Sequence, residues 1–478
     1  MTVRIRRDVY ALPSGDQTLD FYRRAIDILR QRPLSDPTSW WWIGAVHGQP
    51  GFTPPPGSAG FWDRCQHQTW YFLPWHRGYL AAMEATVAKV IRDDLGGPDD
   101  WALPYWNYSE SQAVNPDARN LPPAFRNPNM ADGTPNALFA PRSADAAGDV
   151  GLREADVQLG ALTEPEFTPA SGFNPGFGGP RTGFSHFGSA SGALEQVPHN
   201  VVHVRIDGWM IDPNTAAFDP IFWLHHCNID RLWEEWRTAD PSHTNPADPA
   251  WRTDLSFRLH DADGQPFSFT CADMEDTTQV MGGYRYDTLP APAATMAGDI
   301  TPGEPEMADL GLIPELAGAS DGPVELSGAR TRTPVAMQTE GLGRSFTESA
   351  LPSPIKVYLR LEEVTGTGVP ADFDIMVDLE GDDQPPMAVG ILTTFGVANA
   401  SDPSADHGGA GLTQVYDITE AAERLNLTTE TAPQVQVTFD RVEQRAVTEA
   451  AFPEIEGLTM PTRSEPTIRV GRIAIYFE

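Results

Sequence analysis

Six histidines form two groups of three whose spacing suits metal binding. In the second group, His199 and His203 are four residues apart, so on a helix both imidazoles lie on one face and reach one ion. His226, further along the chain, offers a third ligand. The first group consists of His47, His67 and His76.

The residue types limit which metal these groups would hold. Neutral imidazole suits zinc, copper, iron and nickel. Neither group has a matching carboxylate or thiolate, which favours a redox metal over magnesium or calcium and counts against a di-zinc hydrolase with a bridging carboxylate. The spacing leaves two interpretations open: a dinuclear site made only of histidines, or six hydrogen-bonded histidines in an aromatic-rich core.

The elements that would position these histidines are helices. Apolar residues recur at near-helical spacing in four segments, and start and stop signals such as Pro74, Gly96-Gly97 and Asp219-Pro220 support them. The segments are residues 18–32, 74–97, 197–208 and 218–240. We therefore expect residues 1–290 to form a mainly α domain, a loop-rich four-helix bundle with its site inside.

The rest of the chain differs in composition and in the pattern of its apolar residues. Residues 291–353 are rich in Pro, Ala and Gly, which predicts a linker or wrapping segment. From residue 354 to 478, runs such as "IKVYLRLEEV" and "TIRVGRIAIYFE" are β-branched and partly alternating. These runs predict an antiparallel β-sandwich domain over residues 354–478.

Composition excludes several classes of function. The formal charge of −33 makes nucleic acid and anionic membranes poor partners. No apolar run reaches the ~18 residues of a membrane span, and three scattered cysteines make no disulfide framework. The first residues lack the apolar stretch of a signal peptide. We expect a cytoplasmic protein, while export on a partner protein stays open.

The order of the motifs carries more information than their spacing. "CQHQTWYFLPWHRGYLAAME", "LPYWNY", "HNVVH" and "DPIFWLHHCNIDRLW" follow one another, and "GYRYD" closes the first part. This series resembles the tyrosinase / polyphenol oxidase family of type-3 dicopper proteins, in a bacterial-looking form. The later "DFDIMVDL" resembles the KFDV-type motif of the C-terminal β-domain in plant-type members.

The resemblance implies a dicopper enzyme that oxidises monophenols and o-diphenols to o-quinones, with dioxygen as co-substrate. Copper A would be bound by the first group of three histidines and copper B by the second. Of the adjacent pair His225 and His226, it assigns copper B to His226. His225 would then shape the pocket or orient a phenol.

Other residues receive roles with alternatives beside them. Glu195 and Asn200 would hold a water that deprotonates a monophenol; otherwise Glu195 is a loop carboxylate and Asn200 fills a helix turn. Cys65 would form a thioether to His67, or stay a free buried thiol. Asp230 would order the copper B ligands, or pair with Arg231 or solvent. The residues expected to line the pocket are Met210, Ile211, Phe218 and Phe222.

The resemblance also implies that the β-domain is a lid that keeps the enzyme latent until proteolysis, acid or detergent loosens it. Residues 291–353 would be the cleavage zone, and Phe395 is one candidate for the blocking side chain. The alternative is a purely structural domain. Small phenols would be the substrates, and the oligomeric state stays open. Other functions of the same site are catechol oxidase or o-aminophenol oxidase without monophenolase activity, and a haemocyanin-like oxygen carrier.

Overall fold

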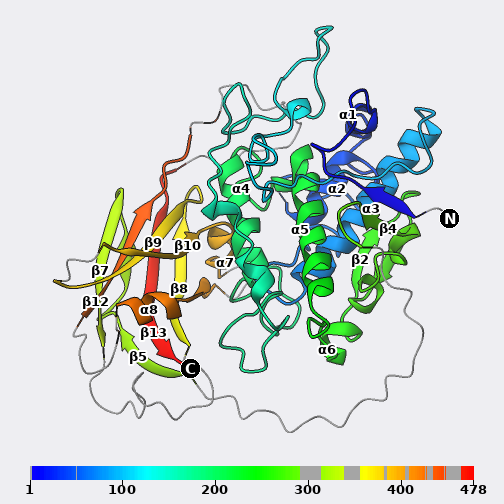
Figure 1. Ribbon diagram of the computed structural model, residues 1–478. Coiled ribbons are helices and arrows are strands. Elements are labelled where there is room, and N and C mark those ends of the chain that lie inside the picture. The colour runs from blue at the N-terminus through cyan, green and yellow to red at the C-terminus, as the bar shows by residue number, and fades with distance from the viewer. Residues whose placement is uncertain are drawn as a thin grey trace.

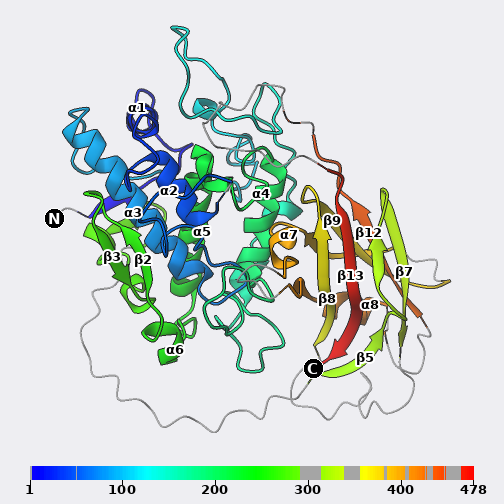
Figure 2. The same cartoon turned by 180° about the vertical axis from the view of Figure 1, so that it is seen from behind.

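The computed structural model describes residues 3–49, 51–290, 314–337, 356–381, 385–403, 409–425, 427, 434–445, 447 and 464–478. The chain forms a helical body and a β body that lie side by side (Figures 1 and 2). No helix among the described residues has the length and hydropathy needed to cross a membrane.

The helical body is built on five helices and a short sixth. These are α1 (Thr18–Arg30), α2 (Trp40–His47), α3 (Phe72–Asp93), α4 (Val201–Ile206), α5 (Pro220–Ala239) and α6 (Pro249–Arg252). The four predicted helical segments are confirmed. At the start of α5, the side chain of Asp219 accepts a hydrogen bond from the Ile221 amide, and Pro220 occupies the first turn, as the sequence signal predicts.

Helix α2 was not predicted, and its burial explains why. Ser39 caps it by accepting a hydrogen bond from the Trp42 amide. Every residue of α2 except the half-buried Trp41 is buried, so the helix has no polar face. A helix that is apolar all round shows no amphipathic period, and a period search therefore misses it.

Two short strands join the ends of the helical body. β1 (Arg4–Arg6) pairs in parallel with β4 (Tyr284–Tyr286), and Arg6 lies opposite Tyr286. A hairpin of β2 (Phe257–His260) and β3 (Pro266–Phe269) completes this side. The first and last elements of the helical body are thus neighbours.

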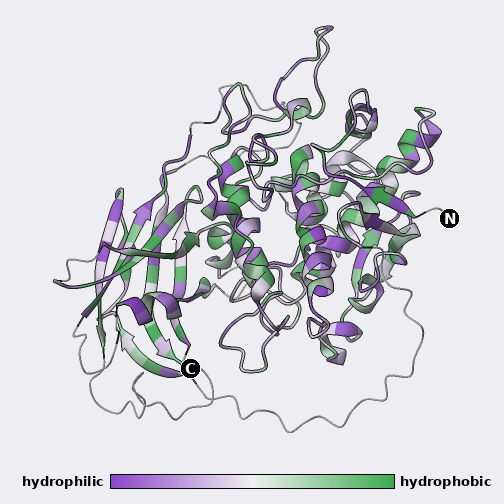
Figure 3. Cartoon of the chain, in the orientation of Figure 1, coloured by the Kyte–Doolittle hydropathy of each residue, from purple (hydrophilic) through white to green (hydrophobic). Residues whose placement is uncertain are grey.

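The β body is one continuous sheet. Its strands are β5 (Glu315–Ala319), β6 (Val324–Leu326), β7 (Arg330–Met337), β8 (Val357–Thr367), β9 (Asp372–Leu379), β10 (Met387–Thr393), β11 (Leu412–Asp417), β12 (Gln434–Arg441) and β13 (Thr467–Phe477). They pair in the order β10-β9-β12-β7-β5-β13-β8-β11, and β6 pairs with β13. Two short helices, α7 (Val397–Ala400) and α8 (Thr419–Arg424), accompany the sheet. Apolar and polar residues alternate along its strands (Figure 3).

The predicted antiparallel pairing is confirmed, but the predicted sandwich of two sheets is wrong for the described strands. All strand pairs of this sheet are antiparallel and belong to one hydrogen-bonded series. Its two end strands, β10 and β11, approach each other, and the Gln414 amide donates to the Thr393 carbonyl at 2.7 Å. Twist has curled the sheet almost into a barrel, which protects its edges.

The predicted linker over residues 291–353 is wrong for residues 315–337, where β5, β6 and β7 lie. In β7, buried residues alternate with exposed ones, but Pro334 and the surrounding small residues hide this period in the sequence. Residues 291–313 and 338–355 lie outside the described residues.

Candidate metal centre

The second histidine group converges on one point inside the helical body. The Nε2 atom of His226, on α5, lies 3.3 Å from Nε2 of His199, just before α4, and 3.3 Å from Nε2 of His203, on α4. Ligands bound at ~2.0–2.1 Å to one tetrahedral ion lie about this far apart. The three nitrogens therefore have the geometry of a metal site.

The first group converges in the same way. His47 ends α2, His67 lies in the loop before α3, and His76 lies in the first turns of α3. One ring nitrogen of each lies within 4.8 Å of the others. All three Nε2 atoms are buried and lack a protein hydrogen-bond partner. Such atoms need a ligand, because an unpaired buried polar group is costly.

The two groups face each other. The rings of His76 and His226 are stacked with centroids 4.5 Å apart, and those of His67 and His199 are 5.9 Å apart. Two ions bound by these groups would therefore be close neighbours, as a dinuclear centre requires.

Hydrogen bonds to the other ring nitrogen orient four of the six imidazoles. Carbonyl oxygens accept from Nδ1 in three cases: Pro213 for His47 at 2.8 Å, Phe72 for His76 at 2.8 Å, and Met210 for His203 at 2.7 Å. The Asn200 side-chain oxygen lies 2.8 Å from Nδ1 of His199. These contacts place the proton on Nδ1 and leave Nε2 free for a metal.

Burial keeps these imidazoles uncharged. It lowers the pKa of His47 to about 3 and the pKa of each of the other five far below its ordinary value, with neighbouring imidazoles adding to the effect. Six buried neutral nitrogens, without a carboxylate or thiolate among them, form a donor set that suits copper.

His225 belongs to the same cluster. One of its nitrogens lies within 4.8 Å of the ligand atoms of His199, His203 and His226. Its Nδ1 lies 3.1 Å from the hydroxyl of Tyr108, and its ring stacks on His199 at 5.3 Å. His225 therefore packs against the ligands of the second group and lines the space beside them.

Glu195 lies beside the centre but has a backbone partner. Both of its carboxylate oxygens accept from the Gln68 amide, at 2.9 and 3.0 Å. Burial raises the pKa of Glu195 to about 8. The Asn200 amide group donates to Ser191 at 3.4 Å, so each residue of the predicted water-holding pair has a protein contact of its own.

The expected pocket residues take different positions. The Phe222 ring lies 4.0 Å from His226 and 5.0 Å from His47, so it packs against one ligand of each group. Met210 contributes its carbonyl oxygen to His203, and Ile211 packs with Val204 and Phe395. Phe218 packs instead against aromatic rings of the core, namely Trp41, Phe52 and Trp209.

Comparison with known proteins agrees with this geometry. The family model described as "Common central domain of tyrosinase" matches residues 37–146 and 173–239. A tyrosinase of a Hahella species is 38% identical over 88% of this chain and 92% of that protein. The chain belongs to the tyrosinase family. It is an enzyme of this family of type-3 copper oxidases.

More distant relatives share the family or the fold. A chloroplastic polyphenol oxidase of Spinacia oleracea is 29% identical over 60% of this chain, which spans 48% of that protein. Latent apple tyrosinase has the same fold over 100% of this chain and 97% of its own, with a TM-score of 0.64 and 20% identity. Residues 313–478 match a domain of unknown function. That match begins near β5, in agreement with the extent of the sheet.

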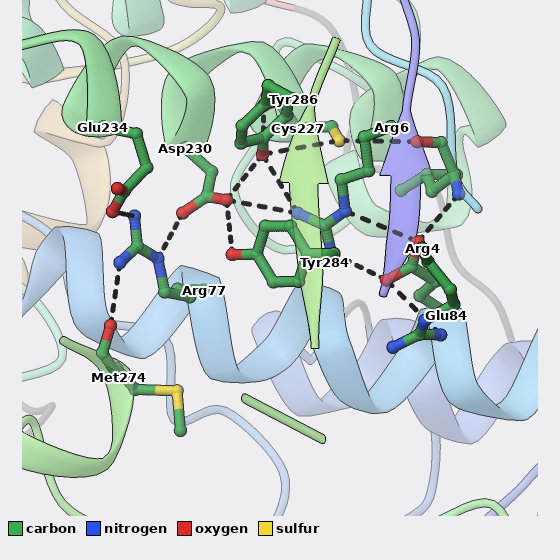
Figure 4. A network of polar contacts seen from close by, with 11 residues as sticks. Arg4, Arg6, Arg77, Glu84, Cys227, Asp230, Glu234, Met274, Tyr284 and Tyr286 are labelled. Carbon is green, nitrogen blue, oxygen red and sulfur yellow. Dashed lines mark hydrogen bonds and ion pairs between the residues drawn. The ribbon is translucent and has the colours of Figure 1, made fainter. Parts of the chain in front are cut away.

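In this member of the tyrosinase family, Asp230 lies at the centre of a buried ion network (Figure 4). Arg77 donates to it at 2.5 Å and Arg6 at 3.1 Å, and the hydroxyls of Tyr284 and Tyr286 donate at 2.6 and 2.5 Å. Burial opposes the charge of Asp230, yet the two guanidinium groups hold its pKa below the ordinary value. Arg231, the partner considered from sequence, pairs with Glu235 instead.

This network braces the two helices that carry histidines of both groups. Arg77 follows His76 on α3, and Asp230 lies one turn after His226 on α5. Arg6, on β1, also bonds Glu84 of α3 at 2.9 Å. The spacing between His76 and His226 is therefore fixed by ion pairs as well as by packing.

The β body reaches the centre through Phe395. This residue lies between β10 and α7, and its ring is 6.0 Å from His67 and 5.9 Å from His199. Phe187, from the helical body, stacks on His67 at 5.1 Å and packs in the core of the β body. The two bodies therefore meet directly over the histidines.

Several site residues were not singled out from the sequence. Phe72 packs 4.7 Å from both His76 and His199, and its position four residues before His76 was a usable helical signal. His186, Phe187 and Tyr108 come from loops. No periodicity marks such residues, so only the fold brings them to the centre.

Proposed function

We propose that this chain is a latent tyrosinase that uses dioxygen to oxidise monophenols and o-diphenols to o-quinones. The observation that supports it best is the pair of facing groups of three buried, neutral imidazoles. Copper A would be held by His47, His67 and His76, and copper B by His199, His203 and His226. When bound, the copper pair supplies the redox chemistry with dioxygen.

The protein's own groups supply orientation and proton transfer. Phe222 and the ring of His225 bound the space next to the second group. Glu195 is the base that this proposal assigns to a monophenol. Burial raises its pKa to about 8, which lies between ordinary carboxyls and a phenol of pKa ~10. A base in this range removes a phenol proton more readily than an exposed carboxylate.

Latency follows in this proposal from the β body. Phe395 fills the space over the histidines that a phenol ring would need, and ion pairs hold the two bodies together. Arg153 donates to Asp374 of β9 at 2.6 Å, and Arg445 donates to Asp149 at 2.7 Å. A protease that cuts between β4 and β5 would remove the covalent tether, so that only these contacts would hold the β body and it could dissociate from the site.

The test uses copper-loaded full-length protein before and after limited proteolysis. Copper content is measured first, and about two ions per chain are expected. Catechol oxidation is expected to be low in the intact chain and to rise after cleavage. Equal activity before and after would refute latency, and no activity in either form would refute phenol oxidation. Reversible dioxygen binding without quinone formation would establish an oxygen carrier.

A second function is favoured by one observation. The oxygen of Asn200 is engaged by His199, and both oxygens of Glu195 are engaged by Gln68. If these bonds persist, the pair does not hold a water, and the enzyme is a catechol or o-aminophenol oxidase without monophenolase activity. The cleaved protein is therefore assayed on a monophenol, a catechol and an o-aminophenol, and turnover of the monophenol excludes this alternative.

A further inference from the structure

The sulfur of Cys65 lies between two imidazoles. Its Sγ is 3.2 Å from Nδ1 of His67 and 3.2 Å from Nδ1 of His186. His186 is only 3% exposed, and both of its ring nitrogens face oxygens: Nδ1 lies 2.7 Å from the Cys65 carbonyl, and Nε2 lies 2.7 Å from Asp63 Oδ1. These contacts fix the His186 ring at both of its nitrogens.

His67 differs from the other oriented histidines. Oxygen atoms anchor Nδ1 of His47, His76, His199 and His203, whereas the atom that lies next to Nδ1 of His67 is the cysteine sulfur. Sulfur is a weak hydrogen-bond acceptor. A covalent bond from this sulfur to the ring would give His67 an anchor as firm as those of its neighbours.

The backbone keeps His186 in register with His67. The His67 amide donates to the His186 carbonyl at 3.2 Å, and the Gly188 amide donates to the His67 carbonyl at 2.8 Å. Phe187 stacks on the His67 ring with 15° between the planes. The segment that carries His186 is therefore fixed beside the His67 ring, and His186 contacts the Cys65 sulfur at the same place.

We propose that His186, held by Asp63, is the positioning residue that fixes Cys65 Sγ against the His67 ring so that a thioether forms there. The inference rests on the proposed function, because the oxidant is dioxygen at the copper-loaded centre. The only ring carbon next to Nδ1 that carries a hydrogen is Cε1, so the new bond is Sγ–Cε1.

The reaction balances with one molecule of dioxygen. Cys65 loses its thiol hydrogen and His67 loses the Cε1 hydrogen, and the S–C bond forms. Two electrons and two protons pass to dioxygen, which becomes hydrogen peroxide. The chain becomes lighter by the mass of two hydrogen atoms, and one thiol can no longer be alkylated.

The experiment loads full-length protein with copper in air and follows its intact mass. Alkylation after denaturation is then mapped by peptide, so that Cys227 and Cys271 serve as internal controls that stay free. Cys65→Ala is the variant that cannot lose the two hydrogens. His243→Gln is the matched control, because His243 stacks on Trp236 and its Nδ1 hydrogen-bonds the Trp236 carbonyl, away from Cys65.

We expect His186→Gln to form the thioether at least roughly tenfold more slowly than the wild type, because misplaced reacting groups lose rate steeply. Asp63→Gly, which suits the positive φ of 59° at that position, is expected to slow it too. His243→Gln should match the wild type. Copper content is measured on every sample, and Asp63→Gly carries the test if His186→Gln binds less copper.

Two results would overturn the proposal. One is a wild-type rate of thioether formation in His186→Gln or, where that variant binds less copper, in Asp63→Gly. The other is wild-type protein in which all three thiols stay alkylatable after copper loading. Catechol oxidation by cleaved protein from the same batch is recorded separately, so a missing thioether with active enzyme rejects this inference and leaves the proposed function standing.

Discussion

The phenyl ring of Phe395 stacks on the imidazole of His203, with 4.3 Å between their centroids and 23° between their planes. Phe395 belongs to the β body and His203 to α4 of the helical body. In the proposed function, the ring of a phenol that approached the second histidine group would also lie against the His203 imidazole. The β body therefore presents an aromatic ring where the proposed substrate's ring would lie.

Replacement of this ring should relieve the block without proteolysis. We expect Phe395→Ala to raise catechol oxidation by the intact, copper-loaded chain roughly tenfold, which corresponds to about 1.4 kcal/mol of lost stacking and burial. The rates of intact and cleaved protein are compared by quinone formation. Phe184→Ala removes an exposed phenyl ring elsewhere and should change nothing. Unchanged latency in Phe395→Ala would show that another contact blocks the site.

The adjacent histidines should respond differently to mutation. His226 lies 3.3 Å from two other ligand nitrogens, so His226→Ala should lose about half of the bound copper and all catechol oxidation. His225 contacts Tyr108 and should not bind copper, so His225→Ala should keep the metal and change KM or kcat. Metal analysis and steady-state kinetics check both. The reverse pattern would mean that His225 is the copper B ligand.

Stability should depend on pH through Asp372, a buried carboxyl at the contact between the two bodies. Arg205 of α4 lies 3.4 Å from it, Asp156 shares that arginine, and Arg153 and Asp374 lie nearby. Burial raises the pKa of Asp372 from 3.8 to about 7, and Asp156 adds to the rise while Arg205 opposes it.

A carboxyl with a raised pKa binds its proton more tightly in the folded state, so unfolding releases the proton. The contribution of Asp372 to stability is therefore largest below 3.8, falls as pH rises towards about 7, and is constant above that. Asp372→Asn should remove this fall. Urea unfolding at several pH values checks it: the variant should gain on the wild type as pH rises. A constant difference across that range would refute the assignment.

Loss of the central carboxylate in Figure 4 should be costly. Asp230→Asn leaves Arg6 and Arg77 buried with less opposing charge, and we expect the free energy of unfolding to fall by about 3–5 kcal/mol. The chemical denaturation midpoint measures this loss. Asp93→Asn is the control, because its pairs with Lys89 and Arg92 lie at the surface and should contribute little. Equal effects of the two substitutions would contradict a structural role for the network.

The sequence predicted the histidine centre better than its surroundings. The i, i+4 spacing of His199 and His203 and the order of the motifs were enough to assemble both groups, because local helix geometry fixes such pairs. Helix α2 escaped detection because it lacks a polar face, although it carries His47 at its end. Periodicity reports a boundary between core and solvent, and α2 has no such boundary.

Contacts between distant segments could not be predicted in this way. His186 and Phe187 reach His67 through a loop, and Phe395 arrives from the other body. The closure of β10 towards β11 depends on the accumulated twist of the whole sheet. Each of these depends on the tertiary arrangement, which leaves no mark in the spacing of residues.

The parallel pairing of β1 with β4 has a consequence for synthesis on the ribosome. Arg6 is made long before its partner Tyr286, which lies 280 positions later in the chain. Until β4 has emerged, the guanidinium of Arg6 lacks the rings of Tyr284 and Tyr286, which contact it in the folded protein. Such non-local contacts form slowly. The helical body thus completes its fold only when its last strand appears, before the later strands of the β body have emerged.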